Sequence, residues 1–169
     1  MVEQVGPTDA SCLVVGETGT GKELVARTLH TLSPRAAKPF VVVDCGGLVG
    51  SLVTSSLFGH ARRAFTGAVK DSVGLIESAA GGTLYLDELA SLPLELQPIL
   101  LRVLESGTFQ RVGEGRVREV DFRLIASTTR ELEGEVAAGR FRADLYYRVA
   151  TQGLMRGLAL RFPLCFSYA

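Results

Sequence analysis

The sequence lacks the features that would place it in a membrane, in an oxidising compartment or on nucleic acid through bulk charge. No apolar run approaches the roughly 20 residues that span a bilayer, and we expect neither a membrane segment nor a signal peptide. The three cysteines are odd in number and far apart, which excludes a disulfide framework and favours the reducing cytoplasm. Eighteen basic residues balance eighteen acidic ones, so binding of nucleic acid through net positive charge is not expected.

What the sequence does contain is enough apolar surface for one buried core. The chain has 169 residues and a mass of 18.1 kDa, and 47% of its residues are hydrophobic. Its mean hydropathy of +0.25 argues against global disorder. We therefore expect one domain rather than a multi-domain protein.

Short apolar runs bounded by turn residues predict buried strands, and helical patterns separate these runs. Strands are expected over residues 12–15, 40–44, 83–87 and 122–127, and helices over residues 22–32 and 92–105. Ser91 is the expected N-cap of the second helix and Gly107 follows its end. Pro98 lies inside this helix, where it would remove a hydrogen bond. Strands that alternate with helices predict an α/β fold, a parallel sheet covered by helices on both faces.

Two segments do not fit this alternation and are expected to be insertions. Residues 59–71 form a loop with glycines near both ends and Phe65 in its middle, and this loop is too long for an ordinary connection. Residues 107–120 are polar and contain glycine, which predicts a hairpin or a loop. No low-complexity linker marks a second domain.

A phosphate-binding loop is predicted where the first strand meets the first helix. The segment Gly16-Glu17-Thr18-Gly19-Thr20-Gly21-Lys22 has the spacing GxxxxGK. Its glycines let backbone N–H groups surround phosphate oxygens, and its lysine reaches the outer phosphates. Glu23 follows at the position where serine or threonine usually binds Mg²⁺, which on chemistry alone weakens the magnesium assignment. The alternative is a glycine-rich turn without a ligand.

An acidic pair ends the third predicted strand, in the sequence Leu84-Tyr85-Leu86-Asp87-Glu88. A hydrophobic strand that ends in two carboxylates can place one beside phosphate-bound Mg²⁺ and the other beside an attacking water. We assign Asp87 to Mg²⁺ and Glu88 to polarising the water. The alternative is that both residues only cap the helix that follows.

Five segments that occur in one order resemble a known family: GETGTGKELVARTLH, LFGHARRAFTGA, GGTLYLDEL, LLRVLESGTFQRVG and FRADLYYRV. They resemble the central AAA+ ATPase domain of the sigma-54-dependent bacterial transcription activators, over about Pro7 to Val149. The resemblance implies a P-loop NTPase of the AAA+ type that binds ATP and Mg²⁺ and assembles into a homo-oligomeric, hexameric ring. It also implies ATP hydrolysis coupled to remodelling of the sigma-54 RNA polymerase complex. Because the family has glutamate after the lysine as a rule, Glu23 is expected here.

The loop Arg63-Ala64-Phe65-Thr66-Gly67-Ala68 resembles the GAFTGA motif of this family. The resemblance implies that the loop projects from the ring and contacts sigma-54 through Phe65, Thr66 and Gly67. An aromatic side chain in a glycine-flanked loop suits a contact anchor, and the alternative is that Phe65 folds back onto the core. Arg63 replaces the first glycine of the motif and, with Arg62, brings bulky cations to a place where the family has flexibility.

Arg142 and Arg148 match the two arginines that, by resemblance, reach into the ATP site of the neighbouring subunit. Six residues apart on one helix, they would point about 120° apart. One is therefore expected to contact the phosphate, because a guanidinium stabilises the charge on the transferred phosphoryl group, and the other to orient or sense it. The alternative is a pair of exposed arginines bound to Asp144.

Two further site positions depart from the family. Thr129 stands where the family usually has a sensor asparagine, and it offers a hydroxyl in place of an amide. Asp44 stands where asparagine commonly restrains the catalytic glutamate. A carboxylate facing Glu88 would repel it unless one of the two is protonated.

We assign residues 1–149 to an incomplete AAA+ core and residues 150–169 to a tail that does not match the family. The resemblance implies an adenine-binding segment before Met1 and a fifth strand and helical lid after Val149, and none is recognisable in the chain. No helix-turn-helix for direct DNA binding is recognisable either. An unfilled sheet edge with apolar residues nearby predicts self-association. The absence of the lid, which in the family closes over the nucleotide, predicts weak ATP binding. Two alternatives stay open: a non-catalytic or weakly active truncated fragment, and an AAA+ ATPase that acts on another protein.

Overall fold

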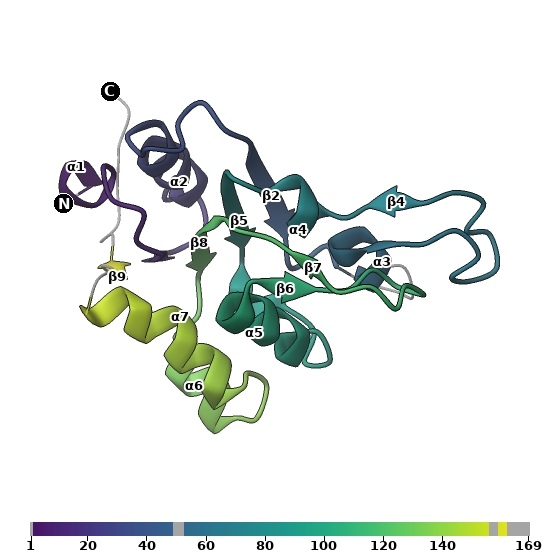
Figure 1. Ribbon diagram of the computed structural model, residues 1–169. Coiled ribbons are helices and arrows are strands. Elements are labelled where there is room, and N and C mark those ends of the chain that lie inside the picture. The colour runs from purple at the N-terminus through teal and green to yellow at the C-terminus, as the bar shows by residue number, and fades with distance from the viewer. Residues whose placement is uncertain (1, 49–52, 156–158, 162–169) are drawn as a thin grey trace.

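The fold is built on a parallel sheet with the strand order β2-β5-β8-β1-β9 (Figure 1). The computed structural model describes residues 2–48, 53–155 and 159–161. The strands of the sheet are β1 (Cys12–Val15), β2 (Phe40–Asp44), β5 (Thr83–Asp87), β8 (Arg123–Thr128) and β9 (Ala159–Arg161). Because neighbouring strands all run parallel, their carboxyl ends meet at one edge of the sheet.

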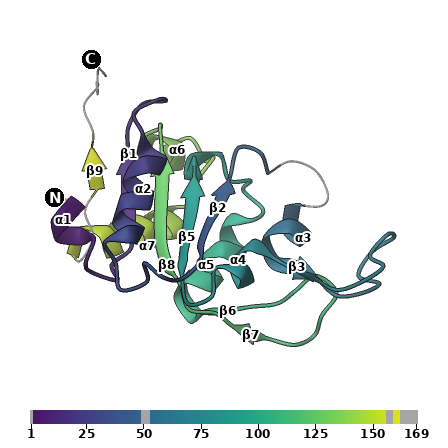
Figure 2. The same cartoon turned by 90° about the horizontal axis from the view of Figure 1, so that it is seen from above.

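Helices cover both faces of this sheet (Figures 1 and 2). One face carries α1 (Val2–Val5) and α2 (Lys22–Thr31). The other carries α3 (Val53–Phe58), α4 (Leu75–Ser78), η1 (Leu89–Ser91), α5 (Gln97–Ser106), α6 (Leu132–Ala137) and α7 (Ala143–Met155). Side chains alternate along β8: Ile125 packs on the face that carries α1 and α2, whereas Leu124 and Ala126 pack on the face that carries α5 and α7. None of the helices that the structure describes is long and apolar enough to cross a membrane.

The predicted α/β fold is confirmed, and three of the four predicted strands have the predicted bounds. The fourth begins at Arg123, one residue later than expected. The first predicted helix is α2, which ends at Thr31. Apolar runs located these strands well because β5 and β8 lie between other strands and under helices, so almost every position in them is buried.

The second predicted helix begins later than the sequence indicated. The short helix η1 comes first, and α5 starts only at Gln97, so Ser91 is not its N-cap. Pro98 therefore stands in the first turn of α5, where its missing N–H removes no helical hydrogen bond. Gly107 ends the helix with φ +64°, a left-handed conformation that glycine adopts readily.

Both predicted insertions are hairpins, and they extend away from the sheet together (Figures 1 and 2). Their strands are β3 (Gly59–His60) with β4 (Ser72–Val73), and β6 (Thr108–Phe109) with β7 (Arg118–Glu119). The backbone of Val112 exchanges hydrogen bonds with Gly59 at 3.0 Å and with Ala61 at 2.9 Å. The loop between β3 and β4 therefore stands on a base that the two hairpins share.

A buried arginine ties the N-terminal segment to the sheet. Arg123, the first residue of β8, is only 1% exposed. Its guanidinium donates hydrogen bonds of 3.0–3.2 Å to the backbone carbonyls of Val5, Gly6, Ala10 and Leu29. These bonds hold α1 and the segment before β1 against α2 and the sheet.

The sheet edge beside β1 is not open. β9 pairs in parallel with β1, with Ala159 opposite Leu13 and Arg161 opposite Val15. Helix α7 continues to Met155, six residues beyond Val149. The expectation of an unfilled edge after Val149 is therefore wrong, because a fifth strand supplies hydrogen-bond partners to β1.

Candidate functional site

The predicted phosphate-binding loop connects the end of β1 to the start of α2. Gly19 and Gly21 have φ values of +83° and +78°, a backbone conformation that is costly for residues with a Cβ. Lys22 is the first residue of α2, and its ammonium donates to the carbonyl of Gly16 at 2.9 Å and to that of Glu17 at 3.0 Å. The loop thus presents a lysine and backbone N–H groups at a helix N-terminus, which together suit a polyphosphate.

The residue after the lysine is bound to its own helix. Glu23 forms an ion pair of 2.8 Å with Arg27, one turn further along α2. The guanidinium of Arg27 also lies 4.9 Å from the centre of the Phe40 ring. Both partners of the ion pair are about half exposed, so the pair contributes little to stability.

The predicted acidic pair lies on the same sheet edge as the phosphate-binding loop. Asp87 ends β5, and only β8 separates β5 from β1. Glu88 has φ 53° and ψ 55°, a left-handed conformation that is strained for a residue with a side chain. Although Glu88 stands at the N-cap of η1, its side chain makes no cap hydrogen bond. The capping alternative therefore does not describe Glu88.

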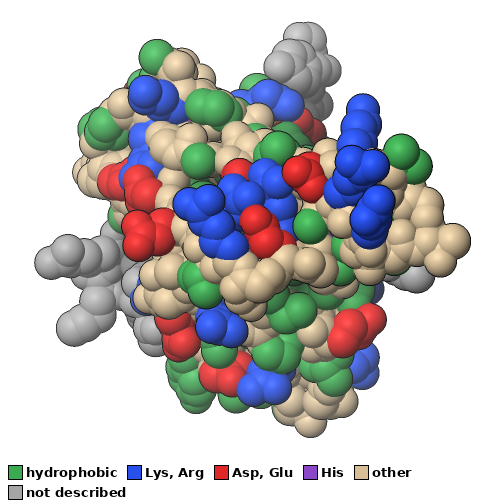
Figure 3. All heavy atoms as spheres, turned by 45° about the vertical axis from the view of Figure 1, so that its right-hand side comes forward, with side chains coloured by type: hydrophobic (Ala, Val, Ile, Leu, Met, Phe, Trp, Pro, Cys, Tyr) green, Lys and Arg blue, Asp and Glu red, His purple; other side chains and the backbone are tan. Residues whose placement is uncertain are grey.

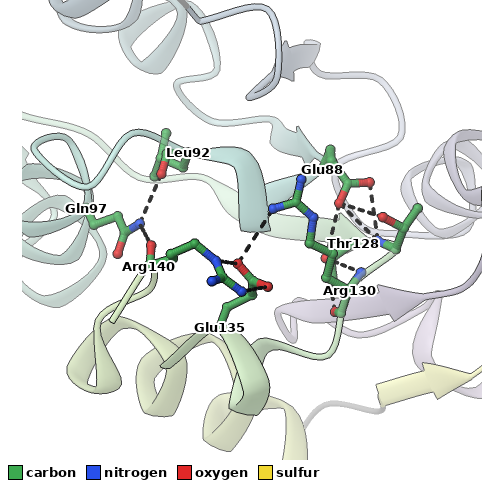
Figure 4. A network of polar contacts seen from close by, with 8 residues as sticks. Glu88, Leu92, Gln97, Thr128, Arg130, Glu135 and Arg140 are labelled. Atoms are coloured by element: carbon green, nitrogen blue, oxygen red, sulfur yellow. Dashed lines mark hydrogen bonds and ion pairs between the residues drawn. The ribbon is translucent and has the colours of Figure 1, made fainter. Parts of the chain in front are cut away.

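The Glu88 carboxylate is held by the end of β8. Its Oε1 accepts hydrogen bonds from the hydroxyl of Thr129 at 2.9 Å, the N–H of Thr129 at 3.1 Å and the hydroxyl of Thr128 at 3.3 Å. Figure 4 shows Glu88 facing Thr128 from the neighbouring strand. The residue predicted at the sensor position, Thr129, is thus in direct contact with the residue predicted to polarise water.

Asp87 is bound by two hydroxyl groups that the sequence analysis did not assign. Its Oδ1 accepts from Ser127 Oγ at 2.5 Å and from the Tyr85 hydroxyl at 3.0 Å. Burial raises the pKa of Tyr85 above its ordinary value. Strand alternation, which places residues 85 and 87 on one face, is the signal that could have found Tyr85. No comparable signal points to Ser127.

Asp44 lies beside the acidic pair but binds elsewhere. It ends β2 and stands opposite Asp87 in the register of the sheet. Its Oδ1 accepts the N–H of Gly46 at 2.9 Å, which closes the turn after the strand. In the part of the chain that the structure describes, the hydrogen bonds to the Glu88 carboxylate come from Thr128 and Thr129. The restraint of Glu88 thus comes from β8 and not from the position of Asp44.

The two arginines predicted to act across a subunit interface are engaged within the chain. Arg142 stands directly before α7, and its carbonyl accepts the N–H of Tyr146 at 3.0 Å. Its guanidinium pairs with Asp144 at 2.7 Å, a bond that raises the pKa of Arg142 and lowers the pKa of Asp144. Arg148 is half-buried and donates to the carbonyl of Leu104 in α5. The alternative of a pair with Asp144 is therefore observed for Arg142.

A buried amide, which sequence reasoning missed, lies next to Arg142. The Gln97 side chain is fully buried, accepts the N–H of Arg142 at 2.8 Å and donates to the Arg140 carbonyl at 3.2 Å. Arg140 also forms an ion pair of 2.8 Å with Glu135 (Figure 4). Glu135 in turn lies 3.6 Å from the guanidinium of Arg130. This chain of contacts connects α5 and α6 to the residues that follow β8, so the start of α7 is linked to the strand that holds Glu88.

The loop that resembles GAFTGA forms a closed turn at the tip of the first hairpin. The N–H of Arg63 donates to the Ala68 carbonyl at 2.8 Å, and Arg63 has φ +66°, which is strained for a residue other than glycine. Phe65 is half-buried, and its ring meets the His60 ring edge-on with 5.0 Å between centres. The two residues that follow it are exposed. Phe65 thus folds back onto its own hairpin and not onto the core of the sheet.

The donor groups at this edge fit Mg²⁺ that arrives with a nucleotide. The described residues contain no cluster of three or more histidine, cysteine or acidic side chains that could hold a metal alone. Mg²⁺ typically takes one or two carboxylates and completes its shell with phosphate oxygens and waters. Asp87, on the same sheet edge as the phosphate-binding loop, supplies that kind of incomplete site, with Glu88 beside it.

Comparison with known proteins identifies the family. The profile of the family described as the Sigma-54 interaction domain matches residues 1–155. The chain belongs to this family. The matched range is wider than the range of about Pro7 to Val149 expected from the motifs, and it includes α7 to its last residue.

Relatives and solved structures agree with membership of the Sigma-54 interaction domain family. The chain is 52% identical over 149 residues to the anaerobic nitric oxide reductase transcription regulator NorR of Salmonella paratyphi C, with 88% of the chain and 29% of NorR covered. NtrX from Brucella abortus in complex with ATP is 42% identical with a TM-score of 0.81, covering 88% of the chain and 33% of NtrX. The P-loop NTPase domain of a sigma-54 activator from E. coli is 26% identical with a TM-score of 0.59, covering 97% of the chain and 91% of that domain.

These comparisons confirm the P-loop NTPase fold of sigma-54 activators that the motifs predicted. The chain spans about a third of the length of NorR and of NtrX.

Proposed function

We propose that this domain binds ATP together with Mg²⁺ and hydrolyses it. The observation that supports this most is the position of Lys22 and the acidic pair at the ends of β1 and β5, on one edge of a parallel sheet. Ligands of open α/β folds bind at this edge. The arrangement suits phosphoryl transfer, in which catalysis is mostly positioning and charge neutralisation.

Each residue at the sheet edge has a role in this proposal. Backbone N–H groups of the loop from Gly16 to Gly21 bind phosphate oxygens, while the N–H of Gly16 itself donates to the Thr128 carbonyl at 3.2 Å. Lys22 exchanges its loop carbonyls for the outer phosphates. Asp87 holds Mg²⁺, which when bound neutralises phosphate charge. Glu88 polarises the attacking water, and Thr129 orients Glu88 through the contacts described above. Asp44 lines the same edge from β2.

We further propose that the domain works in the cytoplasm in a homo-oligomeric ring that remodels the sigma-54 RNA polymerase complex. The family is described as a Sigma-54 interaction domain, and NorR is a transcription regulator. The contact with sigma-54 is proposed for Phe65, Thr66 and Gly67, because the hairpin that carries them extends from the sheet (Figure 1). Arg142 and Arg148 act on the ATP site of a neighbouring subunit.

The experiment that tests catalysis across an interface is the ATPase rate as a function of protein concentration. A rate per subunit that rises steeply with concentration supports a site completed by a second subunit. Mixing the Glu88→Gln variant with the Arg142→Ala variant sharpens the test, because each would supply the group that the other lacks. A constant rate per subunit, with no recovery in the mixture, contradicts the role of the arginine.

A second candidate is a nucleotide-binding domain with little turnover. The observation that favours it is that Arg142 pairs with Asp144 and Arg148 binds the Leu104 carbonyl within the same chain. ATP binding without turnover at every protein concentration would support this candidate. A partner other than sigma-54 would show as retained ATPase activity without binding of purified sigma-54.

A further inference from the structure

We propose that Tyr85 and Ser127 are positioning residues that fix one oxygen of Asp87 and direct the other toward Mg²⁺. This inference rests on the proposed function, since it concerns how the chain presents its magnesium ligand. The two hydroxyl groups come from different strands, β5 and β8, and converge on the same atom, Asp87 Oδ1.

The two hydrogen bonds occupy Oδ1. Ser127 Oγ lies 2.5 Å and the Tyr85 hydroxyl 3.0 Å from it, and a carboxylate oxygen has two lone pairs in its plane. A metal ion, or a water bound to it, then meets Oδ2. Torsions that end in a carboxylate are broad and nearly two-fold. Without the two hydroxyl groups the Asp87 carboxylate would be free to rotate. Because they fix its orientation in advance, less entropy is lost when the metal binds.

The direction of each hydrogen bond follows from the neighbouring groups. The N–H of Glu88 donates to Ser127 Oγ at 3.3 Å, so the single proton of Ser127 is left for Asp87. The Tyr85 hydroxyl donates to the same oxygen at 3.0 Å. Ser127 therefore links the side chain of Asp87 to the backbone of Glu88.

Packing holds both hydroxyl groups in place. The Tyr85 side chain is fully buried and stacks on the Phe40 ring, with 5.9 Å between ring centres and 19° between planes. Ser127 is also fully buried, in β8 between β5 and β1. Because both side chains are buried, neither hydroxyl can exchange its bond to Asp87 for one to solvent, and both act as fixed donors. This rigidity is what orienting a metal ligand requires.

The test separates metal binding from nucleotide binding and from turnover. The affinity for fluorescently labelled ADP is measured first in EDTA. Mg²⁺ is then titrated into a separate protein–ADP mixture without EDTA, and the fluorescence of the labelled ADP is followed. For Tyr85→Phe and for Ser127→Ala, we expect the ADP affinity in EDTA to be unchanged. The Mg²⁺ concentration that gives half of the maximal fluorescence change should rise roughly tenfold. The double variant should need still more Mg²⁺, and Ser127→Thr should restore the parent value because it keeps the hydroxyl.

Two matched controls remove hydroxyl groups elsewhere. Tyr146→Phe removes a hydroxyl bound to Glu133, and Ser106→Ala removes one bound to the Arg102 carbonyl. Neither control should change the Mg²⁺ requirement. The thermal unfolding midpoint of every variant shows whether it is folded.

The outcomes distinguish this inference from the proposed function. A folded double variant with the Mg²⁺ requirement of the parent overturns the positioning role, while the nucleotide site stands. A Mg²⁺ requirement that rises only in proportion to a loss of ADP affinity in EDTA also overturns it, because the effect is then general. A parent chain that binds no ADP in either condition overturns the proposed function, and the inference with it.

Discussion

The hydroxyl of Thr129 donates to the Glu88 carboxylate at 2.9 Å, and the backbone N–H of the same residue lies 3.1 Å and 3.2 Å from its two oxygens. One residue beyond the end of β8 thus holds the acidic residue that follows β5. Because Glu88 has a left-handed backbone, its side chain leaves the strand in a direction that regular β-structure would not give. The contact with Thr129 fixes where that carboxylate ends.

Replacing Thr129 with valine should slow ATP turnover by roughly tenfold, because one hydrogen bond to a charged group is lost while the side-chain shape and the backbone N–H remain. The ATP dissociation constant should stay within about twofold, since Thr129 is assigned to Glu88 and not to the phosphates. Turnover and equilibrium binding are measured on the same samples. Thr129→Ser, which keeps the hydroxyl, is the matched control, and equal losses in the two variants would contradict the role of the hydroxyl.

Replacing Glu88 with glutamine should suppress turnover by about a hundredfold or more and leave ATP binding intact. The amide keeps the shape of the side chain but cannot polarise water as a carboxylate does. Single-turnover hydrolysis of radiolabelled ATP measures the chemical step directly. Hydrolysis at the parent rate by this variant would show that the assignment of the acidic pair is wrong.

Replacing Lys22 with alanine should abolish detectable ATP binding. The backbone N–H groups of the loop cannot compensate for the loss of the cation that faces the outer phosphates. The measurement is equilibrium binding of fluorescent ATP, with Lys38→Ala as control, because Lys38 is an exposed lysine outside the loop. If Lys22→Ala bound ATP with the affinity of the parent, the assignment of the phosphate site to this loop would be wrong.

The sequence predicted those parts of the fold that depend on continuous local patterns. The bounds of β1, β2 and β5 follow from short apolar runs, and the phosphate-binding loop follows from the spacing of its glycines and Lys22. The start of α5 was misplaced because residues 92–96 have an apolar pattern that suits a helix as well as a buried turn. Leu92, which precedes Pro93, has an extended backbone with ψ 124°, so no helix runs through it.

The contacts between strands could not be predicted in the same way. Ser127 binds Asp87 from 40 residues away in the sequence, and the pattern of one strand does not say which strand lies beside it. Arg142 stands directly before the first residue of α7, and its direction relative to Arg148 stays a prediction. Sequence patterns place helix ends only to within a residue or two, which is too coarse to position a side chain in a site.

Replacing Thr66 with alanine should separate hydrolysis from partner binding. Thr66 is exposed on the hairpin loop, away from the sheet edge that carries Lys22, so ATP turnover should stay at the parent rate. Binding of purified sigma-54 in the presence of an ATP transition-state mimic should fall. A Thr54→Ala variant in α3 is the control. Equal sigma-54 binding by parent and Thr66→Ala would count against the loop as the contact.

Replacing Arg123 with leucine should lower the free energy of unfolding by about 3 kcal/mol, measured by urea denaturation. The guanidinium is buried and is the donor to four backbone carbonyls, so its removal leaves buried acceptors without partners, at about 1–3 kcal/mol for a typical unmet group. Leucine fills part of the space, so the loss comes from hydrogen bonding more than from a cavity. Amide hydrogen exchange should accelerate most in residues 2–10, which Arg123 ties to the sheet. Arg116→Leu, at an exposed position, is the control. Parent-like stability and exchange in Arg123→Leu would mean that other contacts hold α1 in place.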